Sequence, residues 1–303
     1  MTELSIYENG AVSLIPSSWE EMTPEQVRNV FKIYDDCLRG NASTLEFNVR
    51  VLYMLLGLKF SRRAARRRGR NPFRAERFGE NVYKICDECL GFLFNKEDTG
   101  DGAKLAYASV VNSLPVVRGV IFGSPLIGPA DLLQDLSFGE FRHAASALNT
   151  FFKSNDVADL DECIAHLYRK RSHRPNRCGR YVKDVENATF DKDVKRVSRL
   201  MGWQKNLIMA WFASCLNYLQ SESLVIDGET VNMALMFAPD DDAKKSDITF
   251  TWNDMLIQIA RDQTIGNIER VDAEPLFSIF SLMWTNYKEN KRNEDRTKSK
   301  TGK

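Results

Sequence analysis

The sequence is poor in the residues and motifs that make enzyme active sites recognisable. Its only histidines, His143, His166 and His173, stand in no local catalytic pattern. No Gly-x-Ser-x-Gly motif indicates a serine nucleophile, and no glycine-rich loop ends in the Gly-Lys-Ser/Thr of a phosphate-binding loop. We therefore expect a protein that is not an enzyme and that needs no cofactor.

Long apolar runs and regularly spaced cysteines are also missing. The longest apolar run, from Leu207 to Leu219, is shorter than the about 20 residues that cross a bilayer and contains Asn217. The N-terminus has no basic segment followed by an apolar one, so we expect no secretory signal. The cysteines follow no disulfide spacing and indicate free thiols in a reducing compartment. These absences predict a protein with no membrane contact.

The composition is that of a folded protein. Apolar residues make up 43% of the chain, which is enough for a hydrophobic core and excludes disorder throughout. At 303 residues the chain is long enough for one large helical domain or two smaller ones. The net charge of +1 is small but hides strong local differences in charge.

Two stretches of the sequence have the same plan. Met22 to Tyr53 and Leu136 to Tyr168 each read as a capped helix, a break at Asn41 or Asn155, and a second helix. Aligned with one gap, they share five identical residues, which are Arg28/Arg142, Asn41/Asn155, Leu45/Leu160, Leu52/Leu167 and Tyr53/Tyr168. The pattern fits a duplicated helical hairpin, but two unrelated helix pairs can share such generic signals.

The start of each stretch carries the same helix signals. Thr23 with Gln26, and Ser137 with Glu140, have the spacing of a capping box. A hydrophobic staple accompanies each box, formed by Met22 with Val27 and by Leu136 with Phe141. Helical periodicity predicts buried faces in both stretches. These faces comprise Val27, Val30, Phe31, Tyr34, Leu38, Leu45, Val49, Leu52 and Leu56, and then Phe141, Ala145, Leu148, Phe152, Leu160, Ile164 and Leu167.

Two short segments predict β-hairpins, and the remainder is mostly helical. Asn9-Gly10 lies between alternating apolar residues from Leu4 to Ile15, which is typical of a tight hairpin turn. The segment from Val225 to Val231 fits a second hairpin, although Gly228 also leaves a helical interpretation open. We predict a mainly α, multi-helix globular protein with small β-hairpins. Residues 1–128 would hold the N-terminal hairpin and first helical unit, residues 129–287 the second helical unit and C-terminal helices, and residues 288–303 a disordered charged tail.

Two arginine-rich runs are the strongest charge feature. They comprise Arg62, Arg63, Arg66, Arg67, Arg68, Arg70, Arg74 and Arg77, and then Arg169, Lys170, Arg171, Arg174, Arg177, Arg180 and Lys183. Guanidinium groups bind phosphates through paired hydrogen bonds, so both runs are candidate nucleic-acid or other polyanion-binding sites. Two alternatives remain: a solvated surface, or arginines paired with acidic patches such as Asp240-Asp241-Asp242.

Two Cys- and His-containing pairs are weak metal-site candidates. Cys86 with Cys89, and Cys163 with His166, each stand three residues apart and together would supply four zinc ligands. Both pairs fall in predicted helices rather than in knuckle turns, so they also fit buried residues of helix faces. We expect no bound metal.

Several segments resemble a group of poorly characterised proteins encoded among the tail genes of tailed phages and prophages of Bacteroides-like bacteria. The segments are L-I-P-S-S-W-E-E-M-T-P-E-Q-V, V-L-Y-M-L-L-G-L-K, G-P-A-D-L-L-Q-D-L-S-F-G-E-F-R-H-A, L-D-E-C-I-A-H-L-Y-R and W-N-D-M-L-I-Q-I-A-R. They cover about half of the chain and rest on helix patterning. The eight-arginine run after Lys59 is not part of the resemblance.

The resemblance implies a non-enzymatic structural or assembly protein, associated with the phage tail. Its partners would be other phage or assembly proteins or further copies of itself, and it would act in the bacterial host cytoplasm or in the virion. The N-terminal hairpin offers a strand edge for such contacts. The alternative is a helical nucleic-acid-binding protein that uses the arginine-rich segments 62–77 and 169–183.

Overall fold

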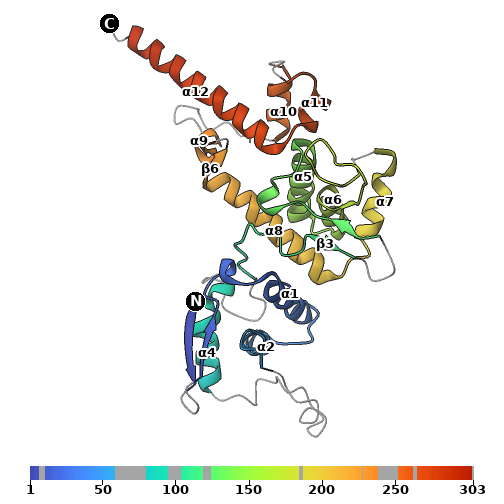
Figure 1. Cartoon of the computed structure of the whole chain (residues 1–303), viewed down its shortest axis with the longest axis vertical. Helices are drawn as coiled ribbons and strands as arrows, with labels where there is room; N and C mark the ends of the chain where they lie inside the picture. Colours follow the sequence, from blue (N-terminus) through green and yellow to red (C-terminus); the bar gives the residue numbers. More distant parts are fainter. Residues whose placement is uncertain are drawn as a thin grey trace. The chain divides into compact units, whose positions relative to one another are not determined.

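The computed structural model describes residues 1–6, 11–58, 80–94, 104–118, 124–183, 187–226, 228–237, 252–261 and 265–301. Over these residues the protein is mainly α-helical, with three small antiparallel sheets, as the sequence predicts (Figure 1). The chain divides into two compact units. Unit 1 comprises Met1–Leu114 and Met201–Trp211, and unit 2 comprises Pro115–Leu200 and Phe212–Lys303. This division differs from the expected boundary after residue 128, because the chain returns to unit 1 at Met201.

Unit 1 begins with the predicted N-terminal hairpin. Strands β1 (Thr2–Ile6) and β2 (Ala11–Ile15) pair antiparallel, with Thr2 opposite Ile15 and Ile6 opposite Ala11. The expected turn at Asn9-Gly10 lies outside the described residues. Within the described chain no third strand joins this pair.

The first predicted helix pair follows as α1 (Pro24–Leu38) and α2 (Thr44–Leu55). The capping box before α1 is present: the Thr23 hydroxyl accepts a hydrogen bond from the Gln26 amide at 3.3 Å, and Gln26 Oε1 accepts from the Thr23 amide at 2.8 Å. Gly40 takes a left-handed φ of 72° after α1, where a side chain would be strained. Ser43 caps α2.

An aromatic cluster fills the core of unit 1. The Trp19 ring lies 4.9 Å from the Tyr107 ring, 6.1 Å from Phe31 and 6.0 Å from Phe92, centroid to centroid. The remaining elements of unit 1 are η1 (Trp19–Glu21), α4 (Glu80–Leu90), η3 (Gly91–Leu93) and the first half of α8 (Gly202–Ser221).

Three apolar residues expected in the core are exposed. Leu38 and Phe152 are 57% and 56% exposed because each lies in the last turns of its helix, beyond the packed part of the face. Leu45 is 47% exposed, whereas Phe47 of the same helix is buried. The Phe47 ring packs edge-on against Phe94 at 5.6 Å, so α2 turns this larger side chain inward and Leu45 outward.

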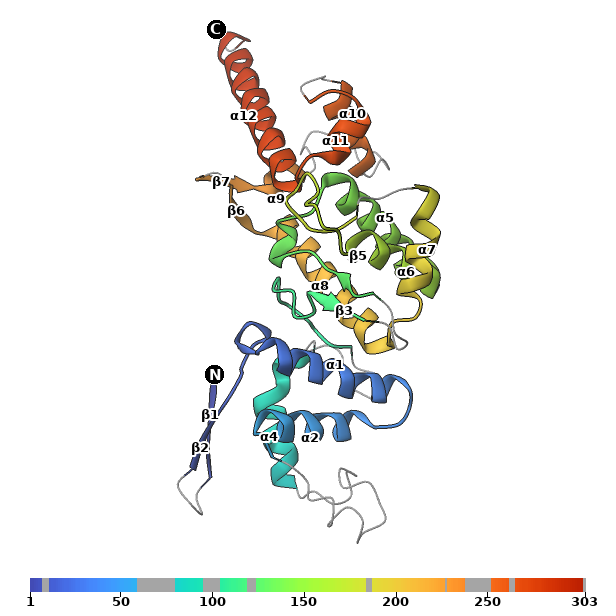
Figure 2. The ribbon, with the colours of Figure 1, turned by 45° about the vertical axis from the view of Figure 1, so that its right-hand side comes forward.

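The second predicted helix pair lies in unit 2, where α5 and α6 pack side by side and α7 packs on α6 (Figure 2). Ser137 and Glu140 form the predicted capping box, and α5 ends at Asn155 with a φ of 55°. The ranges are α5 Phe138–Ser154, α6 Val157–Leu167 and α7 Asn187–Val197. A small sheet accompanies them, of β3 (Val116–Val117), β4 (Leu126–Ile127) and β5 (Arg169–Lys170), with η4 at Asp131–Leu133.

Phe141 of α5 lies at the centre of the unit 2 core. Its ring packs edge-on against Trp252 at 4.8 Å, Phe280 at 6.1 Å and Phe212 at 6.4 Å. Three later helices and α5 therefore share one core. The elements that complete unit 2 are β6 (Ser223–Ile226), β7 (Glu229–Asn232), α9 (Met233–Phe237), α10 (Trp252–Arg261), α11 (Ile268–Ala273) and α12 (Leu276–Thr301).

The C-terminal helix is longer than the sequence pattern predicts. The expected end is Tyr287, but α12 continues to Thr301, over residues assigned to a disordered tail. Lys, Arg and Glu all favour helix, and charges such as Glu289 and Arg292 have a spacing that suits helical ion pairs. The charged segment after Tyr287 therefore continues the helix although it has no apolar residues. The predicted hairpin near Val225 is present as β6 and β7.

Candidate functional site

The second arginine-rich run forms an ordered β-ribbon. Arg169–Lys170 pairs with β4, and the chain then turns back on itself so that Arg171 bridges Val182. The Ser172 amide donates to the Tyr181 carbonyl, and the Lys183 amide donates to the Lys170 carbonyl, both at 2.9 Å. We call residues 169–183 the basic ribbon. The Gly, Pro and Asn residues of the segment favour turns and hide this pairing in the sequence.

Two arginines of the ribbon are buried. Arg169 is 1% exposed and donates from Nη1 to the Ala165 carbonyl at 3.1 Å, with Nη2 4.0 Å from Asp193. Arg180 is 4% exposed and donates from Nη2 to the carbonyls of Ile127 and Leu167. Both guanidinium groups are thus used inside unit 2. In this they differ from the exposed polyanion-binding residues that the sequence predicts at these positions.

The other basic residues of the ribbon lie at the surface. Arg177 is exposed but forms an ion pair with Glu274 at 2.7 Å. Arg171, Arg174 and Lys183 are exposed, and Lys170 is partly exposed. Within the described residues, none of these last four cations forms a salt bridge. As far as the described residues show, the ribbon therefore presents positive charge without salt-bridge partners. The first run, including Arg62, Arg63, Arg66, Arg67, Arg68 and Arg70, lies outside the described residues and stays a prediction.

The weak metal candidates are buried helix residues. Cys86 and Cys89 lie on the inner side of α4, and Cys163 and His166 on that of α6. Burial raises the pKa of Cys86 to about 12 and also raises that of Cys163, which disfavours the thiolate that zinc requires. In the described part of the chain, no three His, Cys, Asp or Glu side chains gather as a metal site would need.

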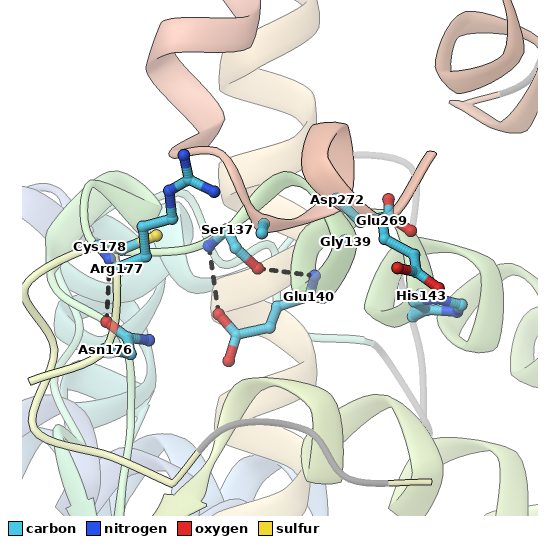
Figure 3. A pocket seen from close by; sticks show the side chains of 10 residues that line it. Ser137, Gly139, Glu140, His143, Asn176, Arg177, Cys178, Glu269 and Asp272 are labelled. Carbon is cyan, nitrogen blue, oxygen red and sulfur yellow. Dashed lines mark hydrogen bonds between the residues drawn. The ribbon is translucent and has the colours of Figure 1, made fainter. Parts of the chain in front are cut away.

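A polar cavity of about 410 Å³ lies where the start of α5, the ribbon tip and α11 meet. Sequence reasoning missed it, because Ser137 and Glu140 read only as helix-capping residues and the other wall lies 130 residues later. The lining residues are Ser137, Gly139, Glu140, His143, Asn176, Arg177, Cys178, Glu269, Asp272 and Ala273 (Figure 3).

The cavity brings an acid, an imidazole and a thiol near one another without joining them. Figure 3 shows the Glu140 carboxyl group directed toward Ser137 and the His143 ring on the side of Asp272. Glu140 Oε2 accepts from the Ser137 amide at 3.2 Å. Within the described residues no hydrogen bond connects Glu140, His143 and Cys178. The cavity therefore lacks the nucleophile–base contact that covalent catalysis requires.

Burial also opposes reactivity of these groups. It raises the pKa of Cys178 to about 11 and lowers the pKa of His143, which the neighbouring Arg142 cation lowers further. It raises the pKa of Glu140, against the opposing effect of the Arg180 cation 3.8 Å away. The thiol is accordingly protonated and the imidazole neutral near pH 7. These are the charge states of structural residues rather than of an activated nucleophile.

Comparisons with protein-family models, with curated proteins and with solved structures found no significant match to this chain. Among the helices of the described residues, none combines the length and the apolar character needed to span a membrane.

Proposed function

We propose that this chain is a non-enzymatic structural or assembly protein that works through contacts with other protein chains. The observation that carries the proposal is the open edge of strand β6. The β6–β7 hairpin has no third strand within the described residues, and β7 packs against α12, with an ion pair between Glu229 and Lys288. Within the described residues, strand β6 therefore has no ladder partner on its second edge, which another extended chain can pair with, while α9 packs on the strand.

Apolar side chains accompany this edge. Val225 of β6 is 75% exposed, and Leu235 of α9, which packs on β6, is 47% exposed. Tyr218 near the end of α8 is 36% exposed. A strand edge with exposed apolar neighbours suits a protein partner, because backbone hydrogen bonds and apolar burial then act together. The N-terminal hairpin β1–β2 is a second pair that no further strand joins in the part of the chain that the structure describes.

The setting that we propose is the tail of a phage or prophage, with other tail or assembly proteins as partners. This part rests on the resemblance of segments such as residues 14–27 and 128–144 to proteins of tail gene clusters. The absence of an activated nucleophile in the polar cavity supports the non-enzymatic part. We propose the bacterial host cytoplasm or the virion as the place of action.

The test combines gene context with complex formation. The neighbouring genes are identified, their products are purified, and binding of each to this chain is measured by analytical ultracentrifugation. We expect a complex with at least one product, or self-association, and a loss of affinity of at least about fivefold in Val225→Lys, because a charge on a strand edge opposes pairing.

Val157→Lys is the matched control, since Val157 is a 55% exposed valine at the start of α6. It should bind like the wild type. A chain that stays monomeric, binds no neighbouring product and lies among metabolic genes would contradict the proposal. Equal losses of affinity in both variants would show that β6 is not the contact surface.

A further inference from the structure

The basic ribbon is one of the two arginine-rich segments of the chain. From Arg169 to Lys183 the sequence contains seven Lys or Arg residues and no Asp or Glu. Arg169 and Arg180 are buried, and Arg177 forms an ion pair with Glu274. The cations that remain at the surface without a salt bridge in the described chain are Lys170, Arg171, Arg174 and Lys183.

An exposed aromatic ring stands among these cations. Tyr181 is 57% exposed, although the next residue, Val182, is 2% exposed. Tyr181 and Lys183 lie on either side of the buried Val182, and the Lys183 amide donates to the Lys170 carbonyl, so the backbones of these two lysines lie opposite each other. The exposed ring therefore lies within two residues of an exposed lysine.

The ribbon is held in one conformation by its own hydrogen bonds. The Asn176 side chain accepts from the amides of Cys178 at 3.1 Å and of Arg180 at 2.9 Å. Gly179 takes a left-handed φ of 80° and completes the tip. Together with the buried guanidinium groups of Arg169 and Arg180, these contacts order the backbone of the ribbon before any ligand binds. Such preorganisation lowers the entropy that a ligand must overcome.

We propose that the basic ribbon binds single-stranded nucleic acid, with Lys170, Arg171, Arg174 and Lys183 contacting phosphates and Tyr181 stacking on a base. A single strand offers both the regular negative charge and an accessible base face. In a duplex the bases are stacked on one another, and the Tyr181 ring would have no partner. An acidic protein segment would match the cations but gives no reason for an exposed ring. The inference is independent of the protein contacts proposed above.

The experiment measures fluorescence anisotropy of a labelled single-stranded oligonucleotide with the full chain over a range of salt concentrations. The ribbon variant is Arg171→Ala/Arg174→Ala/Lys183→Ala. We expect it to bind roughly tenfold more weakly or worse, with a salt slope smaller by about 2, because three phosphate contacts are lost.

The matched control is Lys192→Ala/Lys195→Ala/Arg199→Ala, which removes the same charge from exposed positions on and just after α7. It should keep most of the affinity. The run at residues 62–77 is intact in both variants. If the wild type fails to bind at low salt, or if both variants lose affinity equally, the ribbon is not the binding site and the inference is overturned.

Variants of Tyr181 distinguish the binding of nucleic acid from the binding of any polyanion. Tyr181→Ala should weaken binding roughly 5- to 100-fold, the range for one stacked base, and Tyr181→Phe should not. A duplex of the same length and a poly-glutamate peptide should bind more weakly than the single strand. Equal binding of poly-glutamate, together with no effect of Tyr181→Ala, would overturn the proposal in favour of a surface that attracts any polyanion.

Discussion

Arg180 connects three segments that are distant in the sequence. Its Nη2 donates to the carbonyls of Ile127 in β4 and Leu167 at the end of α6, and its Nη1 lies 3.8 Å from Glu140 at the start of α5. A buried guanidinium group is tolerated only with such partners. The same residue holds the returning arm of the basic ribbon against unit 2, so the ribbon depends on it.

Arg180→Ala should therefore destabilise the protein strongly. It removes two hydrogen bonds to carbonyl groups and one of the two cations, beside Arg169, that act on the buried Glu140 carboxyl group, at a cost of about 3–5 kcal/mol. Urea unfolding followed by circular dichroism measures the change. Arg174→Ala, at an exposed position of the same ribbon, is the control and should stay within about 0.5 kcal/mol of the wild type. Similar stabilities of the two variants would show that Arg180 is not a structural residue.

His166 gives the stability a pH dependence. Burial, together with the nearby His143, Arg169 and Arg142, lowers its pKa from 6.5 to about 3. The ring stacks between His143 and Phe190, and Glu162, 3.9 Å away, is the acid nearest to it. The unfolded chain thus binds a proton more readily than the folded one between these two pKa values.

Above pH 6.5, protonation of His166 should not change the free energy of unfolding. As the pH drops from 6.5 toward 3, the unfolded chain takes up the proton and the free energy of unfolding should fall. His166→Leu should remove this part of the decline, as measured by urea unfolding at a series of pH values. His173→Leu, at an exposed position, should follow the wild-type profile. If His166→Leu also follows it, the decline has another origin.

At the scale of elements, α5 and α11 approach one another closely at Gly139. A Cβ atom there would lie 2.8 Å from Asp272 Cβ and 3.0 Å from the Asp272 carbonyl oxygen. The approach lets Arg142 hold Asp272 with two hydrogen bonds, Nη2 to Oδ2 at 2.8 Å and Nε to Oδ1 at 3.2 Å. This glycine is needed for space between two helices, and its own backbone is ordinary helix.

Gly139→Ala should destabilise the protein by about 1–3 kcal/mol, because a backbone atom stands in the way and α11 must shift. Thermal unfolding measures the loss. Gly91→Ala is the control, since nothing lies within 4 Å of a Cβ at Gly91, and it should be neutral or slightly stabilising. Equal melting temperatures of the two variants would argue that α5 and α11 are not in close contact.

The two helix pairs use an equivalent arginine in the same way. Arg28 of α1 donates to the Ser113 carbonyl at 2.8 Å, and Arg142 of α5 binds Asp272. Each thus ties the first helix of its pair to a segment much later in the chain. The helix ends differ, since Gly40 takes the left-handed conformation after α1 and Asn155 does so after α5. The shared plan keeps duplication open as a hypothesis.

For the molecule as a whole, each compact unit contains one helix pair, and α8 contributes to both units. Its first half belongs to unit 1, where Trp211 Nε1 donates to the Val110 carbonyl at 3.0 Å and Lys32 lies 5.1 Å from the Trp203 ring centroid. Its second half belongs to unit 2, where Phe212 packs on Phe141. A boundary placed at one position in the sequence therefore cannot describe the units.

The fold was predictable where short-range signals decide it. The capping boxes at Thr23 and Ser137 and the hairpin near Val225 depend on residues within a few positions of one another, and all three form. The candidate site was predictable only as a basic segment. The burial of Arg180 and the polar cavity between α5 and α11 depend on residues up to 53 and 130 positions apart, and the strand pairing and the burial of Arg169 also depend on contacts beyond the immediate sequence.

The sequence by itself determined the helical class, the helix starts and the small hairpins of this protein, because backbone capping and apolar periodicity act locally. Only the tertiary structure decided which arginines face the solvent. Arg171 and Arg180 are the same residue type in one basic run, yet one is exposed and the other is buried against distant carbonyl groups. The physical reason is that the position of those acceptors, and not the charge of the side chain, sets the free energy of burying it.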